Sequence, residues 1–195
     1  MHGLINRSLQ CFVRDSYGPS AWAAGAREAN LGFDSFEAML TYDGALTDAV
    51  INAAAHHLDR PREAVLEDLG TYLVSHPNVE ALRRLLRFGG VTFVDFLHSL
   101  EDLPGRGRMA VPDLDLPNLA LTDNGEDQFL LACRAQVQGG GHVMLGLLRA
   151  MADDYGALVM LEHQGLREEA EVISIHILEQ SFAVGRRFDL AEKAG

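Results

Sequence analysis

The chain has 195 residues, of which 48% are hydrophobic, and its formal net charge is −12. This length fits one domain, and the hydrophobic content predicts a packed core rather than a disordered chain. The acidity argues against nucleic acid or an anionic membrane as a partner, because both repel a protein of this charge. No apolar run is long enough to span a membrane and no signal peptide is recognisable, so we expect a cytoplasmic location.

The first half of the chain has the periodicity of successive helices. Apolar residues recur at helical spacing, and Gly or Pro follows most of the segments. The pattern predicts helices over 1–17, 20–31, 46–58, 59–76, 78–90 and 91–103, with a break at Pro104 and Gly105.

The second half alternates strands with one helix. Apolar alternation around DNGE predicts a hairpin over 112–136, and β-branched strands predict a second hairpin over 157–180. Three glycines lead into a helix predicted over 139–156. The expected class is α+β, with a helical N-terminal half packed on a small antiparallel sheet that has an inserted helix.

Most polar motifs have ordinary structural explanations. The glycines 139–141 lack a phosphate-binding pattern, and no GxSxG motif supports a hydrolase, so no enzyme is predicted. His142 could be exposed or could face a pocket, and we favour an exposed position. His163 and His176 are expected to face each other across the last hairpin, without an identifiable third ligand for zinc. Cys11 and Cys133 are expected to remain reduced thiols.

Two interpretations of His98 lead to different functions. It lies in VTFVDFLHSLEDL, an amphipathic segment that should bury its Phe, Val and Leu face. One interpretation is a core histidine with a hydrogen-bond partner, and the other is a metal or haem ligand. The residues alone leave both open.

Several segments together resemble the H-NOX family, the haem nitric oxide/oxygen-binding domains related to the sensor domain of soluble guanylate cyclase. The start resembles the family's opening helix through Met1, Gly3 and the RDSYG segment. VLEDLGTYLVSH is similar to its middle helix, FLHSLEDLPGRGRMAVPDL to its proximal helix and following loop, and HVMLGLLRAMADDYG to its distal helix. The resemblance implies one H-NOX-like domain over 1–185, with a helical subdomain at 1–60, a haem-pocket subdomain at 61–185, and a tail at 186–195.

The resemblance also implies a site. His98 would be the iron ligand of haem b, and Pro112 would press on the porphyrin. The remaining residues expected around the haem are Met1, Ile5, Leu9, Leu73, Val143, Leu147 and, near the propionates, Arg134.

One departure weakens this expectation. The family holds the haem propionates with Tyr-x-Ser-x-Arg, and the matching positions here are Cys133, Ala135 and Val137, with Arg134 nearby but out of register. Each lost hydrogen bond to a carboxylate is worth about 1–3 kcal/mol, so haem binding would be weakened or lost.

Two functions follow from the resemblance. The first is a haem-based sensor that binds nitric oxide and excludes oxygen, because Val143 replaces the oxygen-stabilising tyrosine. It would signal to a partner, which in bacteria is often a histidine kinase or a cyclic-di-GMP enzyme. The alternative is a degenerate module that binds no haem, or another hydrophobic ligand, and acts through protein–protein interaction.

Overall fold

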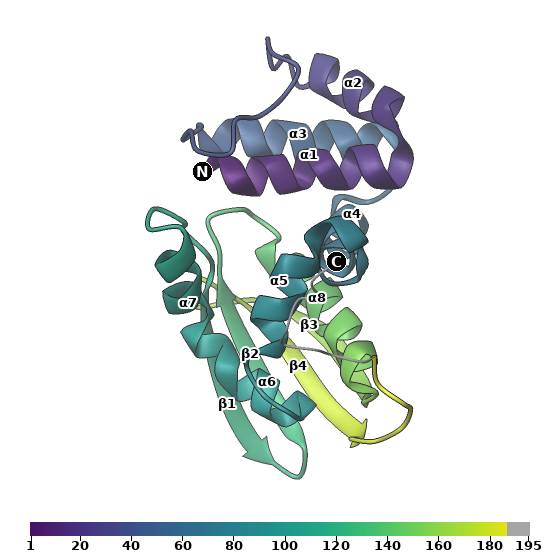
Figure 1. Cartoon of the computed structure of the whole chain (residues 1–195), viewed down its shortest axis with the longest axis vertical. Helices are drawn as coiled ribbons and strands as arrows, with labels where there is room; N and C mark the ends of the chain where they lie inside the picture. The colour runs from purple at the N-terminus through teal and green to yellow at the C-terminus, as the bar shows by residue number, and fades with distance from the viewer. Residues whose placement is uncertain (187–195) are drawn as a thin grey trace, which may run out of the picture.

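The computed structural model describes residues 1–186 and has a helical layer above a helix-covered sheet (Figure 1). Apart from residue 186, the tail predicted at 186–195 lies outside the described residues. Within the described part, no helix is both long and apolar enough to cross a membrane.

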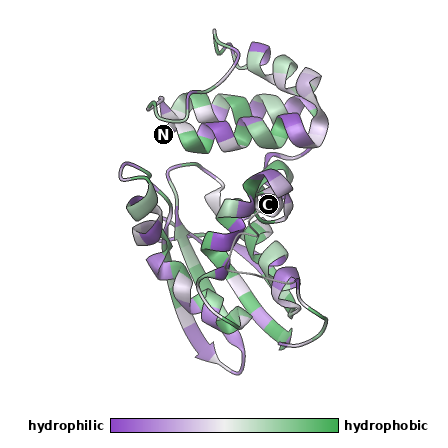
Figure 2. Ribbon diagram, in the orientation of Figure 1, coloured by the Kyte–Doolittle hydropathy of each residue, from purple (hydrophilic) through white to green (hydrophobic). Residues whose placement is uncertain are grey.

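The upper layer consists of three helices. They are α1 (Gly3–Tyr17), α2 (Pro19–Glu28) and α3 (Gly44–His57). The His2 side chain caps α1 by accepting a hydrogen bond from the Leu4 amide, and the Asp43 carboxylate caps α3 in the same way. Gly18 has φ +92°, a conformation that favours glycine, and it separates α1 from α2. Figure 2 shows apolar and polar residues alternating along α1 and α3, which is the pattern of helices with one buried face.

Four further helices and two 3-10 turns follow before the sheet. They are α4 (Arg62–Ser75), the 3-10 turn η1 (Pro77–Val79), α5 (Glu80–Arg87), α6 (Phe93–Ser99), the 3-10 turn η2 (Leu100–Asp102) and α7 (Leu103–Ala110). The break predicted at Pro104 is wrong, because α7 passes through it. Proline is tolerated there because it lies in the first turn of a helix, where its missing N–H has no helical partner.

The sheet has the strand order β1-β2-β4-β3, and all its neighbouring strands are antiparallel. Its strands are β1 (Asn118–Gly125), β2 (Gln128–Arg134), β3 (Leu158–Arg167) and β4 (Ala170–Glu179), and α8 (Gly140–Tyr155) connects β2 to β3. The predicted α+β class with an inserted helix is therefore confirmed. The first hairpin turns at Glu126 and Asp127, both at positive φ, so the turn overlaps the end of the predicted DNGE signal.

Two apolar cores lie above and below α4. The upper core joins α1, α2 and α3 to one side of α4 through Val65, Leu66 and Tyr72. The lower core joins α5, α6 and α8 to the sheet and includes Val74 of the same helix. Helix α4 is therefore shared by both cores, and the boundary predicted after residue 60 stays a prediction.

Candidate functional site

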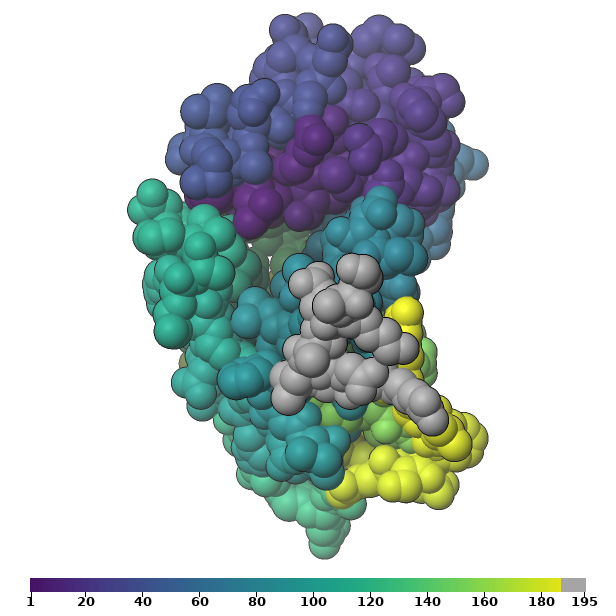
Figure 3. Space-filling model, in the orientation of Figure 1, coloured from purple at the N-terminus to yellow at the C-terminus, as the bar shows by residue number. Residues whose placement is uncertain are grey.

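A hollow separates the upper helices from the lower half of the molecule. Figure 3 shows it between the purple N-terminal helices and the teal segments below them. The predicted pocket wall comes from three of the surrounding helices: α1 with Ile5 and Leu9, α4 with Leu73, and α8 with Val143 and Leu147.

The structure brings part of this predicted wall together. Leu9 is buried in the upper core, and Leu73 and Val143 pack against that core as partly buried side chains. Ile5 is half-buried, and Leu147 is buried in the lower core. An apolar surface with these residues could hold a hydrophobic ligand.

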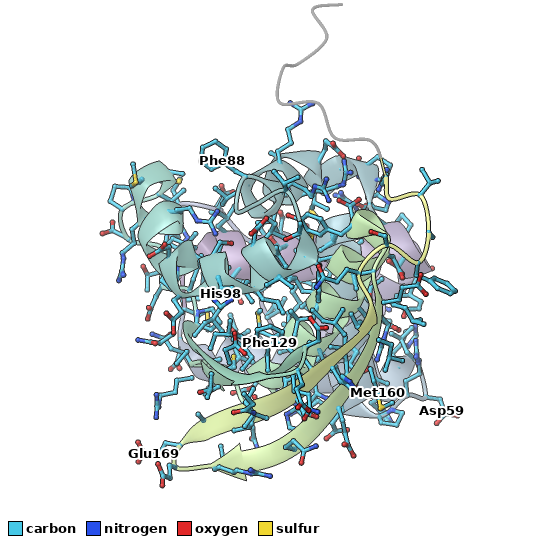
Figure 4. All side chains as sticks on the ribbon, turned by 90° about the horizontal axis from the view of Figure 1, so that it is seen from below. Asp59, Phe88, His98, Phe129, Met160 and Glu169 are labelled. Atoms are coloured by element: carbon cyan, nitrogen blue, oxygen red, sulfur yellow. The ribbon has the colours of Figure 1, made fainter. Side chains whose placement is uncertain are left out.

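His98 has different neighbours. It lies in the last turn of α6, and its side chain is 53% exposed. Its Nε2 atom lies 4.0 Å from a carboxylate oxygen of Asp123 on β1, and its ring meets the Phe129 ring edge-to-face with centroids 5.9 Å apart. Figure 4 shows His98 and Phe129 close together below α6. His98 therefore faces the tip of the β1–β2 hairpin.

The hairpin tip lies far from the predicted wall. Phe129 is four residues before Cys133 on β2, which is about 13 Å along a strand, and Cys133 pairs with Glu171. The Glu171 carboxylate accepts a hydrogen bond from the Gly141 amide, in the first turn of α8 next to Val143. His98 and Val143 are thus associated with different ends of β2.

Helix α8 gives a second measure of the same separation. Its last residue, Tyr155, packs on Phe96, which lies two residues before His98, with ring centroids 5.9 Å apart. Val143 precedes Tyr155 by twelve residues, which is about 18 Å of helix. The predicted iron ligand His98 and the predicted wall residue Val143 are therefore associated with opposite ends of α8.

The other predicted site residues are scattered. Pro112 is exposed in the loop before β1, and Arg134 is exposed at the end of β2. The Met1 ammonium group donates a hydrogen bond to the Tyr42 carbonyl, 2.7 Å away, so it fastens the chain start to the loop before α3.

A carboxylate from another loop lies beside the expected propionate-binding segment. Gln136, in the loop that follows β2, donates a side-chain hydrogen bond to the Asp115 carboxylate in the loop before β1. Cys133 is buried in the lower core, and Ala135 packs against it. An anionic group placed beside Gln136 would therefore meet another carboxylate, which disfavours it.

The sequence analysis missed a polar cluster at the start of α8. The rings of His142 and His163 stack with centroids 4.1 Å apart and planes 16° apart. His142 is therefore not exposed as predicted, since only 16% of its side chain is accessible. His163 also does not pair with His176, because the sheet register sets His163 opposite Ile173 and His176 opposite Met160. Nothing in the local sequence indicates this stacking, which depends on how α8 crosses the sheet.

A polar cavity of 310 Å³ borders this cluster. Its lining comes from α3, α4, the loop before α8, and β4: Asp48, Asn52, Arg62, Glu63, Leu66, Gln138, Gly139, His142 and Glu171. The Arg62 guanidinium spans the cavity wall, because it donates to the Asp48 carboxylate at 2.6 Å and to the Gln138 carbonyl at 3.1 Å. Arg62 thus connects the upper helices to the segment that precedes α8.

These features define the chain as a two-layer α+β domain with a hollow between parts of its layers. A family profile described as Haem-NO-binding matches residues 2–163. The chain therefore belongs to the Haem-NO-binding family, which has the fold of haem-based gas sensors. The sequence-based recognition of an H-NOX domain is confirmed.

Two curated relatives are soluble guanylate cyclases. The chain is 23% identical over 154 residues to soluble guanylate cyclase gcy-31 of Caenorhabditis elegans, covering 79% of the chain and 22% of that protein. It is 21% identical over 160 residues to soluble guanylate cyclase 89Db of Drosophila melanogaster, covering 82% and 24%. The chain thus spans about a quarter of the length of these relatives and matches their sensor portion.

Solved H-NOX structures share the fold. An H-NOX protein from S. oneidensis in the Fe(II)NO ligation state superposes with a TM-score of 0.77 at 16% identity, covering 92% of this chain and all of that one. An H-NOX protein from K. algicida, in the Fe(II) unliganded state, gives 0.76 at 16% identity, covering 92% and 97%. At such identities the likeness establishes the fold alone.

Proposed function

We propose that this domain is a signalling module that works without a His98-ligated haem and acts through contact with a partner protein. The observation that carries the proposal is the position of His98, which contacts Phe129 and Asp123 at the hairpin tip rather than Val143 at the start of α8. Without a ligand on the hollow's side, the strongest bond between the fold and an iron porphyrin is missing.

The altered propionate segment supports the same conclusion. Cys133 is buried and has no hydroxyl group that could donate to a propionate. The Asp115 carboxylate, which accepts a hydrogen bond from Gln136, places a negative charge beside that segment. The propionates of a haem would therefore lack the hydrogen bonds that the Tyr and Ser of the family motif provide. The hollow is better suited to an uncharged apolar ligand, or to none.

The partner is the less defined part of the proposal. The curated relatives that match this chain are named as guanylate cyclases, and the chain corresponds to about a quarter of their length. A module of this kind passes a change in shape to another domain or protein. A histidine kinase or a cyclic-di-GMP enzyme in a cytoplasmic bacterial setting remains the predicted partner class.

The visible absorption spectrum tests the haem question directly. The intact chain is produced with haem supplied in excess, and the spectrum is recorded in the ferrous state with and without nitric oxide. We expect no stoichiometric Soret band and no shift on adding nitric oxide. A thermal unfolding curve of the haem-free chain should be cooperative, because the two cores are complete without a cofactor.

His98→Ala serves as the matched variant. We expect it to resemble the parent in its spectrum and to unfold within about 0.5 kcal/mol of it, because the replaced side chain is half exposed. A stoichiometric Soret band that shifts with nitric oxide and disappears in His98→Ala would overturn the proposal and establish the haem-based nitric oxide sensor instead.

A further inference from the structure

The stacked histidines and their carboxylate partners bring four elements together at the start of α8. His142 lies in the first turn of α8, His163 on β3, and their carboxylate partners are Glu67 of α4 and Glu171 of β4. Among residues 1–186 no group of three or more His, Cys, Asp or Glu side chains is arranged to hold a metal ion. The pair is therefore better understood through its protons than through a metal.

The hydrogen bonds of His163 determine where its proton sits. The Gly165 amide donates to His163 Nδ1 at 3.2 Å, so Nδ1 carries no proton and the neutral ring is protonated on Nε2. That Nε2 atom is buried without a hydrogen-bond partner, and the nearest Glu171 oxygen is 3.8 Å away. A second proton on this ring would have to bind at Nδ1. There it would face the Gly165 N–H group, and two donors cannot form a hydrogen bond with each other.

His142 can take a proton without such a conflict. Its Nδ1 atom lies 3.2 Å from a Glu67 oxygen and donates to that carboxylate. Its ring lines the polar cavity, so Nε2 can be protonated from solvent. A proton on each ring would therefore create two cations whose ring centroids lie 4.1 Å apart.

The charges around the pair come from every element packed against it. Glu67 and Glu63 of α4, Glu171 of β4 and Asp48 of α3 are acidic, whereas Arg62 of α4 and Arg149 of α8 are basic. Arg149 and Glu67 are themselves paired at 3.3 Å. The acidic groups outnumber the basic ones by two, but only Glu67 is within hydrogen-bond distance of a ring, at His142 Nδ1, and the nearest Glu171 oxygen is 3.8 Å from His163.

We propose that His142 and His163 form an acid-sensitive latch that holds the first turn of α8 against β3 and β4 and releases it when both rings are protonated. Burial, together with the charge on His142, lowers the pKa of His163, although Glu171 and Glu67 oppose the shift. Release therefore occurs below the ordinary histidine value of about 6.5. The bonds lost are the Gly165 N–H donation to His163 and the nearby Gly141 N–H donation to Glu171.

The experiment uses the intact chain labelled with ¹⁵N. Imidazole ¹⁵N shifts at pH 7.5 should place a single proton on His163 Nε2. Amide exchange is then compared at pH 7.5 and pH 5.0 after correction for the intrinsic pH dependence of exchange. We expect the protection of the Gly141 and Gly165 amides to fall at least tenfold at pH 5.0, whereas the centre of β2 is unchanged.

Two variants separate the latch from general acid sensitivity. His163→Asn keeps an acceptor for the Gly165 amide but cannot be protonated, so its protection should be equal at both pH values. His142→Gln removes one of the two charges and should reduce the loss to less than threefold. His57→Asn, at an exposed position on α3, should behave like the parent.

The proposal is overturned if parental protection is the same at both pH values. It is also overturned if His163→Asn or His142→Gln loses as much protection at pH 5.0 as the parent. These measurements need no haem, so their result is independent of the spectroscopic test of His98.

Discussion

Gly70 of α4 and Gly146 of α8 each lie directly against the backbone of the other helix. A methyl group at Gly70 would overlap the Val143 carbonyl, and one at Gly146 would overlap the Glu67 carbonyl. The two helices can therefore cross at backbone contact, and this crossing sets the position of the first half of α8 beneath the upper layer.

Alanine at this crossing should be strongly destabilising. We expect Gly70→Ala or Gly146→Ala to lower the free energy of unfolding by about 3 kcal/mol, because the backbones must separate to admit the methyl group. Urea unfolding measures the change. Gly25→Ala is the control, since a methyl group at that position in α2 meets no atom within 4 Å and should be neutral or stabilising by up to about 1 kcal/mol. Equal effects at Gly25 and Gly70 would contradict the close crossing.

A buried ion pair fixes α5 to the end of α8. Arg83 and Asp154 are 3% and 4% exposed, and the Arg83 Nε atom donates to the Asp154 carboxylate at 2.9 Å. Asp154→Asn should cost about 3–5 kcal/mol of unfolding free energy, because it removes the buried carboxylate that faces Arg83 and Arg87 and leaves Arg83 with the more exposed Glu80. Asp153→Asn, at the exposed neighbouring position, should change stability by less than about 0.5 kcal/mol. Thermal denaturation of both variants measures these two changes in stability.

The two thiols should differ in reactivity. Cys133 is 1% exposed, and burial, with a smaller contribution from Glu171, raises its pKa to about 12. Since the thiolate is the reactive form, native protein at pH 8 should react with a disulfide reagent at Cys11 only, and at both sites in denaturant. Cys11→Ser should then show no fast reaction in the native state. Rapid modification of Cys133 without denaturant would show that the sheet opens at this position.

Asp15 should give the fold a defined dependence on acid. Burial raises the pKa of its carboxyl group, but hydrogen bonds from Asn78, Tyr72 and Arg14 outweigh burial and lower it. The stabilisation is therefore present above the unfolded value of about 3.9 and is lost as pH falls below it. Tyr72→Phe removes a 2.8 Å hydrogen bond to the carboxylate and should cost about 1.5–3 kcal/mol at pH 7.

The pH dependence of that cost identifies the carboxylate as its origin. The difference between Tyr72→Phe and the parent should shrink in urea unfolding as the pH is lowered from 7 to 3, because any protonation of Asp15 weakens it as a hydrogen-bond acceptor. Tyr42→Phe removes a hydroxyl that accepts only from the Glu37 amide, so its cost should not change with pH. A cost at Tyr72 that is the same at pH 7 and pH 3 would argue against this explanation.

Much of the fold could be predicted from the sequence, because its signals are local. Alternating apolar residues identified both hairpins, and the glycines at 139–141 marked the start of α8 close to its observed position. The helix ending at Ser99 was expected to continue to 103, because the 3-10 turn that follows it has nearly the same apolar spacing. Pro104 was misjudged because its effect depends on its position in the helix.

The site could be predicted only in part, because it depends on contacts between distant segments. Leu9, Leu73 and Val143 lie in one apolar cluster as predicted. The orientation of His98 depends on which strand ends lie beneath α6, and a sequence motif does not contain that information. His163 was paired with the wrong residue because alternation alone does not fix the β3–β4 register, which places His163 opposite Ile173, three residues from His176.

The sharing of α4 has a consequence for how the chain can be divided. Val65, Leu66 and Tyr72 contribute to one core and Val74 to the other, although all four lie within three turns of one helix. A fragment that begins after α3 would expose Val65, Leu66 and Tyr72 to water. A fragment that ends before α4 would leave α1, α2 and α3 without the α4 side chains on which they pack. Proteolysis between α3 and α4 should therefore give fragments that aggregate. A chimaeric protein should include both layers of this domain rather than one of them.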